Sequence, residues 1–199
     1  MITKAEARLH CRAETFAEED ALFDALIAAA YKTAENMTGR SFVDRTETLV
    51  LDGFPASTLY VTTLASCFPK SIKGLSNTVE LPWTPVQSVD SVEYVDPEGE
   101  TQTLNAPPLR LDTRPLYPTL APQWGTEWPD TIDEPESVTI TATVGYADED
   151  LPPDVRCALL LIIGHLYANR ESVVIGTISS ELPMGVHALL DPYKIHRIG

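Results

Sequence analysis

The sequence has few cysteines, little positive charge and no apolar run long enough to cross a membrane. Its 199 residues include three cysteines, Cys11, Cys67 and Cys157, which lie far apart and show no metal-ligand spacing. This usage fits a reducing compartment and excludes a disulfide scaffold. The longest apolar run falls short of the roughly 20 residues that span a bilayer. The first residues carry charges and lack the apolar core of a signal peptide, so we expect a soluble protein that stays where it is made.

Basic residues are outnumbered about two to one, with 14 Lys and Arg against 29 Asp and Glu and a formal net charge of −15. Residues 41–151 hold 5 basic and 18 acidic side chains, residues 1–40 hold 5 and 7, and residues 152–199 hold 4 of each. Affinity for nucleic acid comes from Lys and Arg that release counterions, so this composition excludes a protein that grips DNA. The carboxylates either serve solubility alone or form a negative surface past which a duplex can slide.

The sequence contains no recognisable active site. It lacks a phosphate-binding glycine pattern, a serine in a nucleophile elbow and histidines at zinc spacing. Cys157 and His165 are about two helical turns apart, too far to form a nucleophile–base pair, and we interpret both as packed side chains, with Cys157 a buried, inert thiol. The acidic stretches at residues 130–136 and 148–150 lack the ordered spacing of a calcium loop. We therefore expect no catalytic residues, no cofactor and no metal, and not an enzyme.

Helical patterns flank a β-rich middle. Thr3 and Glu6 form a capping-box pattern at the start of a short helix, and a second helix is predicted from about Glu18 to Met37 with Gly39 as its carboxyl-terminal cap. Strands are predicted at 46–51, 58–63, 86–95 and 137–144, with a turn at 96–99, a return strand after it and a bulge or late strand start between Val86 and Val89. We interpret the proline-rich residues 105–135 as a surface excursion with short extended pieces.

The most informative segment is LPPDVRCALLLIIGHLYANRE, residues 151–171. It predicts a helix in which Arg156 is the only charge between Val155 and Tyr167. A helix on the surface of a single domain has one apolar stripe and one polar face, so this helix must be covered on most sides by its own chain or by neighbouring subunits. A short helix follows from Pro183 to Leu190, and the tail YKIHRIG is expected to fray unless a partner holds it.

The order of predicted elements, helices first, then strands, then helices again, predicts an α+β fold. In it, a small helical bundle made by the N- and C-terminal helices carries a large central antiparallel β insertion. We expect a single domain over residues 1–199. Its predicted parts are N-terminal helices at 1–41, a β-rich insertion at 42–150, C-terminal helices at 151–191 and a docking tail at 192–199.

Five segments in this order resemble one family: TGRSF at 38–42, LPWTPVQSVDSVEYVD at 81–96, VTITATVGYA at 138–147, the apolar helix at 151–171 and PMGVHALLDPYK at 183–194. Together they resemble the head–tail connector (adaptor) proteins of long-tailed double-stranded DNA phages and gene-transfer agents. The resemblance covers almost the whole chain. Lys194, where the family commonly has arginine, and the Pro/Trp-rich excursion depart from the family pattern.

The resemblance implies a homo-oligomeric ring below the portal protein, dodecameric to match the portal's symmetry. Such a ring extends the DNA channel, lets double-stranded DNA pass without specific binding and offers a surface to a tail-completion (stopper) protein. It implies a place at the head–tail junction of a virion assembled in the bacterial host cytoplasm, with no membrane partner. We predict a subunit interface at Leu22, Leu26, Leu160, Ile163 and Tyr167, and portal docking by Tyr193, Lys194, Ile195, His196, Arg197 and Ile198.

Two other hypotheses stay open. The β block could be a glycan- or peptide-binding module that uses Trp83, Trp124 and Trp128, in which case the three indole rings should be exposed and coplanar. The acidic loops could instead serve a metal-dependent hydrolase, in which case carboxylates should converge in a pocket.

Overall fold

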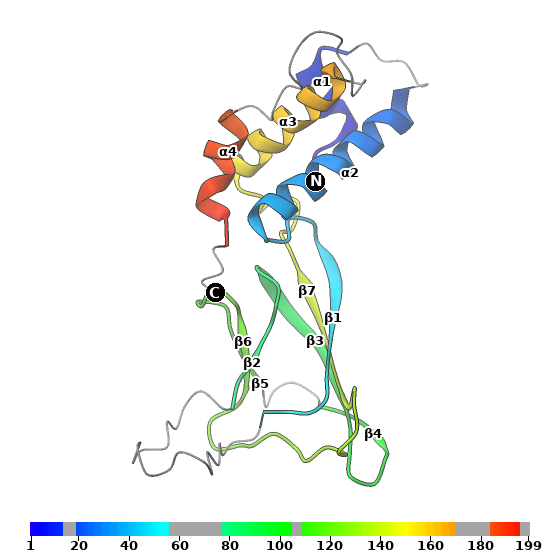
Figure 1. Cartoon of the computed structure of the whole chain (residues 1–199), viewed down its shortest axis with the longest axis vertical. Helices are drawn as coiled ribbons and strands as arrows, with labels where there is room; N and C mark the ends of the chain where they lie inside the picture. Colours follow the sequence, from blue (N-terminus) through cyan, green and yellow to red (C-terminus); the bar gives the residue numbers. More distant parts are fainter. Residues whose placement is uncertain (14–18, 56–76, 105–108, 170–183, 196–199) are drawn as a thin grey trace. The chain divides into compact units, whose positions relative to one another are not determined.

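The computed structural model describes residues 1–13, 19–55, 77–104, 109–169 and 184–195. The chain forms two compact units: a helical unit, Met1–Asp44 with Gly145–Gly199, and a β unit, Arg45–Val144. The β unit is therefore inserted between N- and C-terminal helices (Figure 1), and the predicted α+β class is confirmed. The expected block boundaries, at 41/42 and 150/151, differ from the unit boundaries by a few residues. The candidate strand at 58–63 lies outside the described residues.

The helical unit contains α1 (Lys4–Cys11), α2 (Asp20–Thr38), α3 (Pro153–Ala168) and α4 (Met184–Leu190), followed by a short 3-10 helix, η2 (Asp191–Tyr193). The capping box at α1 is present, because the Glu6 amide donates to Thr3 Oγ1 at 3.2 Å and the Thr3 amide donates to Glu6 Oε2 at 2.8 Å. Gly39 ends α2 in the left-handed conformation, with φ 75°, as predicted. None of the helices within the described ranges is long and apolar enough to cross a lipid bilayer.

Helix α3 is covered largely by its own chain, since it packs against α1, α2 and α4. Its side chains Val155, Ala158, Leu159, Ile162 and Ile163 are fully buried and form the centre of the helical core. The prediction that Cys157 is buried is wrong, because this residue is exposed. At 100° per residue, Cys157 lies about 200° around the helix from both Val155 and Leu159, and therefore faces away from the core.

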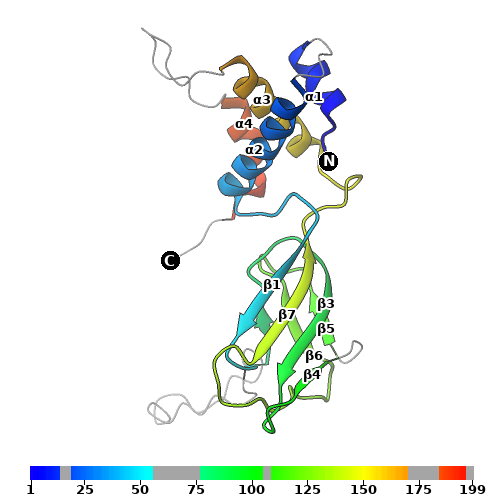
Figure 2. The ribbon, with the colours of Figure 1, turned by 90° about the vertical axis from the view of Figure 1, so that its right-hand side faces the viewer.

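The β unit consists of two antiparallel sheets. The four-stranded sheet has the order β1 (Arg45–Leu51), β7 (Val138–Val144), β3 (Val86–Val95), β4 (Thr101–Thr103). The three-stranded sheet has the order β2 (Val79–Glu80), β6 (Thr119–Pro122), β5 (Leu109–Asp112). Figure 2 shows the first sheet from its outer face, with strands of the second sheet behind it. Buried side chains from both sheets, including Val79, Leu120 and Ile140, form one apolar core.

Strand β7 is the central strand of this core. Its residues Val138, Ile140, Ala142 and Val144 are fully buried, and the threonines between them are half-buried on the other face, which confirms the predicted alternation. The register between β3 and β7 shifts between Val86 and Ser88, where an irregularity was predicted, and shifts again between Val89 and Ser91. Each shift adds a residue to β3 and bends the strand locally.

The proline-rich excursion is more regular than the sequence indicates. Its short extended pieces exist, and two of them, β5 and β6, pair with each other and with β2 to build the second sheet. Strands of two to four residues show too little alternation to be recognised, and the prolines mask them further. In the structure, Pro122 occupies the last position of β6, where its missing N–H is tolerated.

Candidate interaction surfaces

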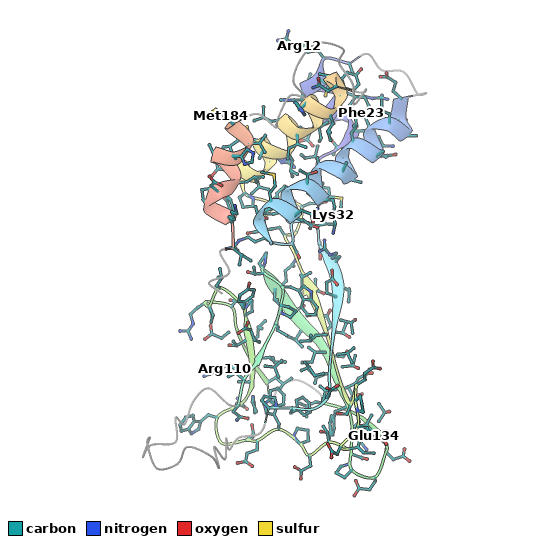
Figure 3. All side chains as sticks on the ribbon, viewed as in Figure 1. Arg12, Phe23, Lys32, Arg110, Glu134 and Met184 are labelled. Carbon is teal, nitrogen blue, oxygen red and sulfur yellow. The ribbon has the colours of Figure 1, made fainter. Side chains whose placement is uncertain are left out.

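The residues predicted to contact a neighbouring subunit occupy α2 and α3. Leu26, Leu160 and Tyr167 are half-buried and pack at the edge of the helical core, and Leu22 is half-buried on α2. The ring of Tyr167 stacks on that of Phe23, with centroids 5.2 Å apart, and its hydroxyl donates to Glu19 at 3.4 Å. Phe23, labelled in Figure 3, joins α2 to α3 in this way. These four side chains retain exposed area that another subunit could cover.

Ile163 differs from the other four predicted contact residues. Its exposed fraction is zero, and it packs in the centre of the helical core beside Leu159 and Ile162. A side chain that its own unit encloses completely has no surface to offer to a neighbour. We therefore assign Ile163 to the core and leave it out of the contact set.

The start of the predicted docking tail is anchored on the helical unit. The Arg40 Nε donates to the Tyr193 carbonyl oxygen at 2.6 Å, and the Ile195 amide donates to the Thr38 carbonyl oxygen at 2.7 Å. The ring of Tyr193 meets that of Phe42 edge to face, with centroids 6.5 Å apart. Burial raises the pKa of the Tyr193 hydroxyl. Tyr193 and Ile195 are thus half-buried anchors, and the expectation that the whole tail frays is wrong for them.

The remaining tail residues divide into two groups. Lys194 lies between the two anchors and is exposed. His196, Arg197 and Ile198 lie outside the described residues. Sequence reasoning missed the anchor because Arg40 and Tyr193 are 153 positions apart. The TGRSF segment at 38–42 contains the residues that receive the tail, but nothing in its local pattern indicates a contact with residues 193–195.

The three tryptophans do not form one flat platform. Trp83 and Trp128 are half-buried and pack against the core of the β unit. The Trp128 ring stacks on Phe54 with centroids 4.4 Å apart, and its indole N–H donates to the Asn77 carbonyl oxygen at 3.1 Å. Trp124, by contrast, is 99% exposed. Two of the three rings therefore have structural roles, which removes the geometric basis of the three-tryptophan binding module.

Acidic loops gather at one end of the four-stranded sheet, where β1 and β3 finish and β7 begins. The loops are tied together, because the Glu136 amide donates to Asp52 Oδ1 at 3.1 Å and the Ile132 amide donates to the Val95 carbonyl oxygen at 3.0 Å. Hydrogen bonds from the Gln102 side chain and from backbone amides of the β3–β4 turn lower the pKa of Asp96. The carboxylates of this end are Asp52, Asp96, Glu98, Glu100, Asp133, Glu134 and Glu136.

These carboxylates do not assemble a metal centre. Within the described residues, no group of three His, Cys, Asp or Glu side chains is placed to hold a metal ion. The cavity inside the β unit, of about 120 Å³, lies between the sheets and is lined mainly by Val and Leu side chains. The acidic end is therefore a negatively charged surface without the convergent pocket that a metal-dependent hydrolase needs.

The helical unit contains an apolar groove of about 580 Å³ between its N-terminal segment and α2. Ile2 and Tyr31 are nearly buried within it, Ile27 and Val43 are half-buried, and Ala28 is exposed at its rim. The Ile2 amide donates to the Tyr31 hydroxyl at 3.0 Å, which fixes both residues. No signal in the sequence pointed to this groove, because its residues come from three separate segments.

Comparison with known proteins finds similar solved structures but no match by sequence. No protein-family model matches the chain, and no curated protein matches it. The structure is similar to a chain in the neck of an empty gene transfer agent (GTA) particle computed with C6 symmetry, with a TM-score of 0.72, 24% identity and coverage of 99% of this chain and 91% of that chain.

Two further structures agree. A chain in the virion of a native GTA particle has a TM-score of 0.71 and 23% identity, covering 99% of this chain and 91% of that one. A chain in the neck of a native GTA particle computed with C12 symmetry has a TM-score of 0.66 and 21% identity, covering 98% of this chain and 88% of that one. The fold is thus shared over nearly the full length of both chains.

Proposed function

We propose that this chain is a structural head–tail connector (adaptor) subunit of a phage-like particle, without catalysis. Identical copies form a ring under the portal protein, twelve in number, which extends the DNA channel and provides the attachment surface for a tail-completion protein. The proposal places the chain in the virion at the head–tail junction, after assembly in the host cytoplasm.

The observation that carries this proposal is the likeness over 98–99% of the chain to proteins of GTA necks and virions. The likeness extends over both the helical unit and the inserted β unit. It therefore concerns the combination of these two units, and not only a small helical bundle of a common kind. The neighbouring neck structures were computed with C6 and C12 symmetry, which is the kind of arrangement that a closed ring of identical subunits requires.

The charge of the chain supports the same function. A net charge of −15 repels the DNA backbone, so a ring of such chains can surround a duplex without holding it. The acidic end of the four-stranded sheet contributes seven of the 29 acidic side chains of the chain. We propose that DNA passes the ring without specific binding.

The helical unit supplies the proposed contacts between subunits and with the portal. Leu22, Leu26, Leu160 and Tyr167 keep exposed apolar area on α2 and α3 and form part of the subunit contact. Tyr193 and Ile195 position the tail. The portal is engaged by Lys194, His196, Arg197 and Ile198. Because Tyr193 and Ile195 are already held on the helical unit, this part of the tail loses less entropy when it binds a partner.

A pull-down with the portal protein tests this function. The variant His196→Ala with Arg197→Ala removes two side chains beyond the anchors and should lose portal binding while the helical unit unfolds at the same temperature as the wild type. The control His187→Ala with Arg110→Ala removes the same residue types from exposed positions on α4 and β5 and should bind as the wild type does. Wild-type protein that fails to bind the portal would contradict the connector function itself, whereas equal binding by both variants would contradict only the role of the tail.

A further inference from the structure

Trp124 is the apex of a tight turn in the loop between β6 and β7. The turn is closed by the Thr126 amide, which donates to the Gln123 carbonyl oxygen at 3.0 Å, and by the Thr126 hydroxyl, which donates to the same oxygen at 2.7 Å. Gly125 has φ +85°, the conformation that the position after the apex residue of such a turn requires. The backbone that carries the indole ring is therefore held by two hydrogen bonds.

The exposure of this indole is unusual for the unit that carries it. Trp124 is 99% exposed, whereas Trp83 and Trp128 both pack against the β core. A buried aromatic ring of this size removes about 150–250 Å² from water, so leaving it fully exposed forfeits a large hydrophobic gain. Tryptophan is also the residue type most enriched where protein contacts are energetically dominant. An indole on a fixed turn is thus suited to insertion into a partner.

The apolar groove of the helical unit has the dimensions and chemistry to receive such a ring. Pockets of about 300–1,000 Å³ bury ligands of drug size, so about 580 Å³ is ample for one indole and the atoms of its turn. Ile2, Ile27, Tyr31 and Val43 supply apolar and aromatic surface, and Ala28 leaves the rim low.

The charges around the two features are complementary. At the groove, Lys4 pairs with Asp24 at 3.0 Å and Glu35 accepts the Phe42 amide, which leaves Lys32 as a lysine with no partner among the described residues. Lys32 is exposed on α2 and is labelled in Figure 3. Near the turn, Glu127 and Asp130 are exposed and make no ion pair within the described part of the chain. The Trp124 turn with these two carboxylates is an acidic knob, and the groove carries this lysine, unpaired within the described residues, so the two features have complementary charge.

We propose that Trp124 of one copy inserts into the groove at Ile2, Ile27, Ala28, Tyr31 and Val43 of a second copy, with Lys32 of that copy beside Glu127 or Asp130 of the first. This inference rests on the proposed ring and names one of the contacts that close it. The knob and the groove lie on different units of the chain, and in the proposed ring the contact runs head-to-tail from each copy to the next. Contacts of this kind repeat from copy to copy and generate rings when the rotation closes.

Oligomer formation by purified variants, measured by mass photometry and negative-stain imaging, tests the contact. Trp124→Ala should weaken association roughly 30-fold or more, which is the effect of losing a dominant contact residue. The matched control Leu116→Ala removes another exposed apolar side chain of the β unit and should assemble as the wild type does. On the groove side, Ala28→Glu should block assembly, whereas Ala21→Glu, at an exposed position of α2 outside the groove, should not.

Mixing the two defective variants gives the sharpest result. A Trp124→Ala chain keeps an intact groove and an Ala28→Glu chain keeps an intact knob, so an equimolar mixture should form heterodimers that do not extend into rings. A photoreactive benzoylphenylalanine in place of Trp124, in a mixture of ¹⁵N-labelled and unlabelled chains, should cross-link to α2 or residues 1–4 of the other isotopic species.

The outcomes separate the two proposals. Wild-type rings that persist in the Trp124→Ala variant, cross-links that stay within one chain, or cross-links outside the groove would overturn this contact and leave the connector function standing. A wild-type protein that forms no ring, alone or with the portal, would overturn the connector function and this contact with it.

Discussion

At the scale of single residues, Gly145 is a position where the fold requires glycine. It has φ +94° where the chain enters the helical unit after β7, and Val43 and Tyr146 form a β-bridge beside it. A Cβ at this position would lie 2.0 Å from the Val43 carbonyl oxygen and 2.5 Å from its carbon. Both neighbouring atoms belong to the backbone and cannot rotate away. Glycine is required here for conformation and for space.

Replacement of Gly145 by alanine should therefore be severe. We expect Gly145→Ala to lower the free energy of unfolding by more than about 4 kcal/mol. A loss of this size is exceptional for a single substitution and is expected where the new side chain clashes with the backbone and strains its conformation. Gly99→Ala is the matched control, because Gly99 has φ +86° but nothing within 4 Å of the added Cβ, and it should cost only about 1–2 kcal/mol. Urea unfolding followed by circular dichroism measures both. Equal costs for the two variants would contradict the role assigned to the Val43 backbone.

At the scale of elements, the amino terminus of α1 is joined to α3 by one carboxylate. Glu6 accepts hydrogen bonds from the backbone and side chain of Thr3, and its Oε1 pairs with Arg156 at 2.9 Å. The Thr3 hydrogen bonds and, to a smaller extent, Arg156 lower the pKa of Glu6 below its ordinary value of 4.5. A carboxyl with a lowered pKa in the folded protein contributes stability above its unfolded pKa and loses it as the pH falls through its folded pKa.

This lowered pKa predicts a pH dependence. At neutral pH the Glu6→Gln variant should be less stable than the wild type, and the difference should shrink as the pH falls below about 4.5, because the wild-type carboxyl then becomes protonated too. Urea unfolding of both proteins between pH 7 and pH 3 measures the difference. A difference that stays constant over this range would show that Glu6 acts by shape alone.

Helix α3 carries a core residue, Ile163, and a proposed contact residue of similar chemistry, Leu160. Ile163→Ala should lower the free energy of unfolding by about 2–5 kcal/mol, because the side chain is fully buried and leaves a cavity. Leu160→Ala removes a half-buried side chain and should cost less in the isolated chain while weakening ring assembly more. Unfolding measurements on the monomer and mass photometry of the assembly distinguish the two effects. A larger loss of monomer stability in Leu160→Ala would reverse the assignment.

The strong sequence patterns predicted the elements that they describe. The capping box at Thr3 and Glu6, the glycine cap at Gly39 and the alternation of β7 each depend on a few neighbouring residues, and the structure confirms them. The second sheet was missed because β2, β5 and β6 are too short to show a period. The prediction that Cys157 is buried was wrong, because the sequence of a helix with apolar residues on all sides does not show which side packs against the rest of its own chain.

The candidate surfaces were harder to predict than the elements. The anchoring of Tyr193 and Ile195 depends on residues 38–42, and the apolar groove combines residues 1–4, α2 and Val43. Neither arrangement has a local spacing that a sequence could reveal. The exposure of Trp124 could not be predicted from the sequence either, because no local pattern distinguishes it from Trp83 and Trp128, which pack against the β core.

At the scale of the whole molecule, the chain combines a helical unit, which carries the surfaces proposed to contact other subunits and the portal, with a strongly acidic β unit. The helical core covers most of the apolar surface of α3, so only the exposed parts of Leu160 and Tyr167 on this helix remain for the proposed subunit contact. The acidic loops make association through the β unit unfavourable except where a partner offers a cation or an apolar socket. Contact surfaces on one unit and negative charge on the other are consistent with a subunit whose copies surround DNA that passes through.

The central claim is that copies of this chain close into a ring on the portal. Electron cryomicroscopy of the purified chain mixed with the portal tests it most directly. We predict a twelve-fold ring of helical units seated on the portal, with density at the groove of each copy from the turn of its neighbour. Single, unordered copies on the portal, or no complex at all, would contradict the account.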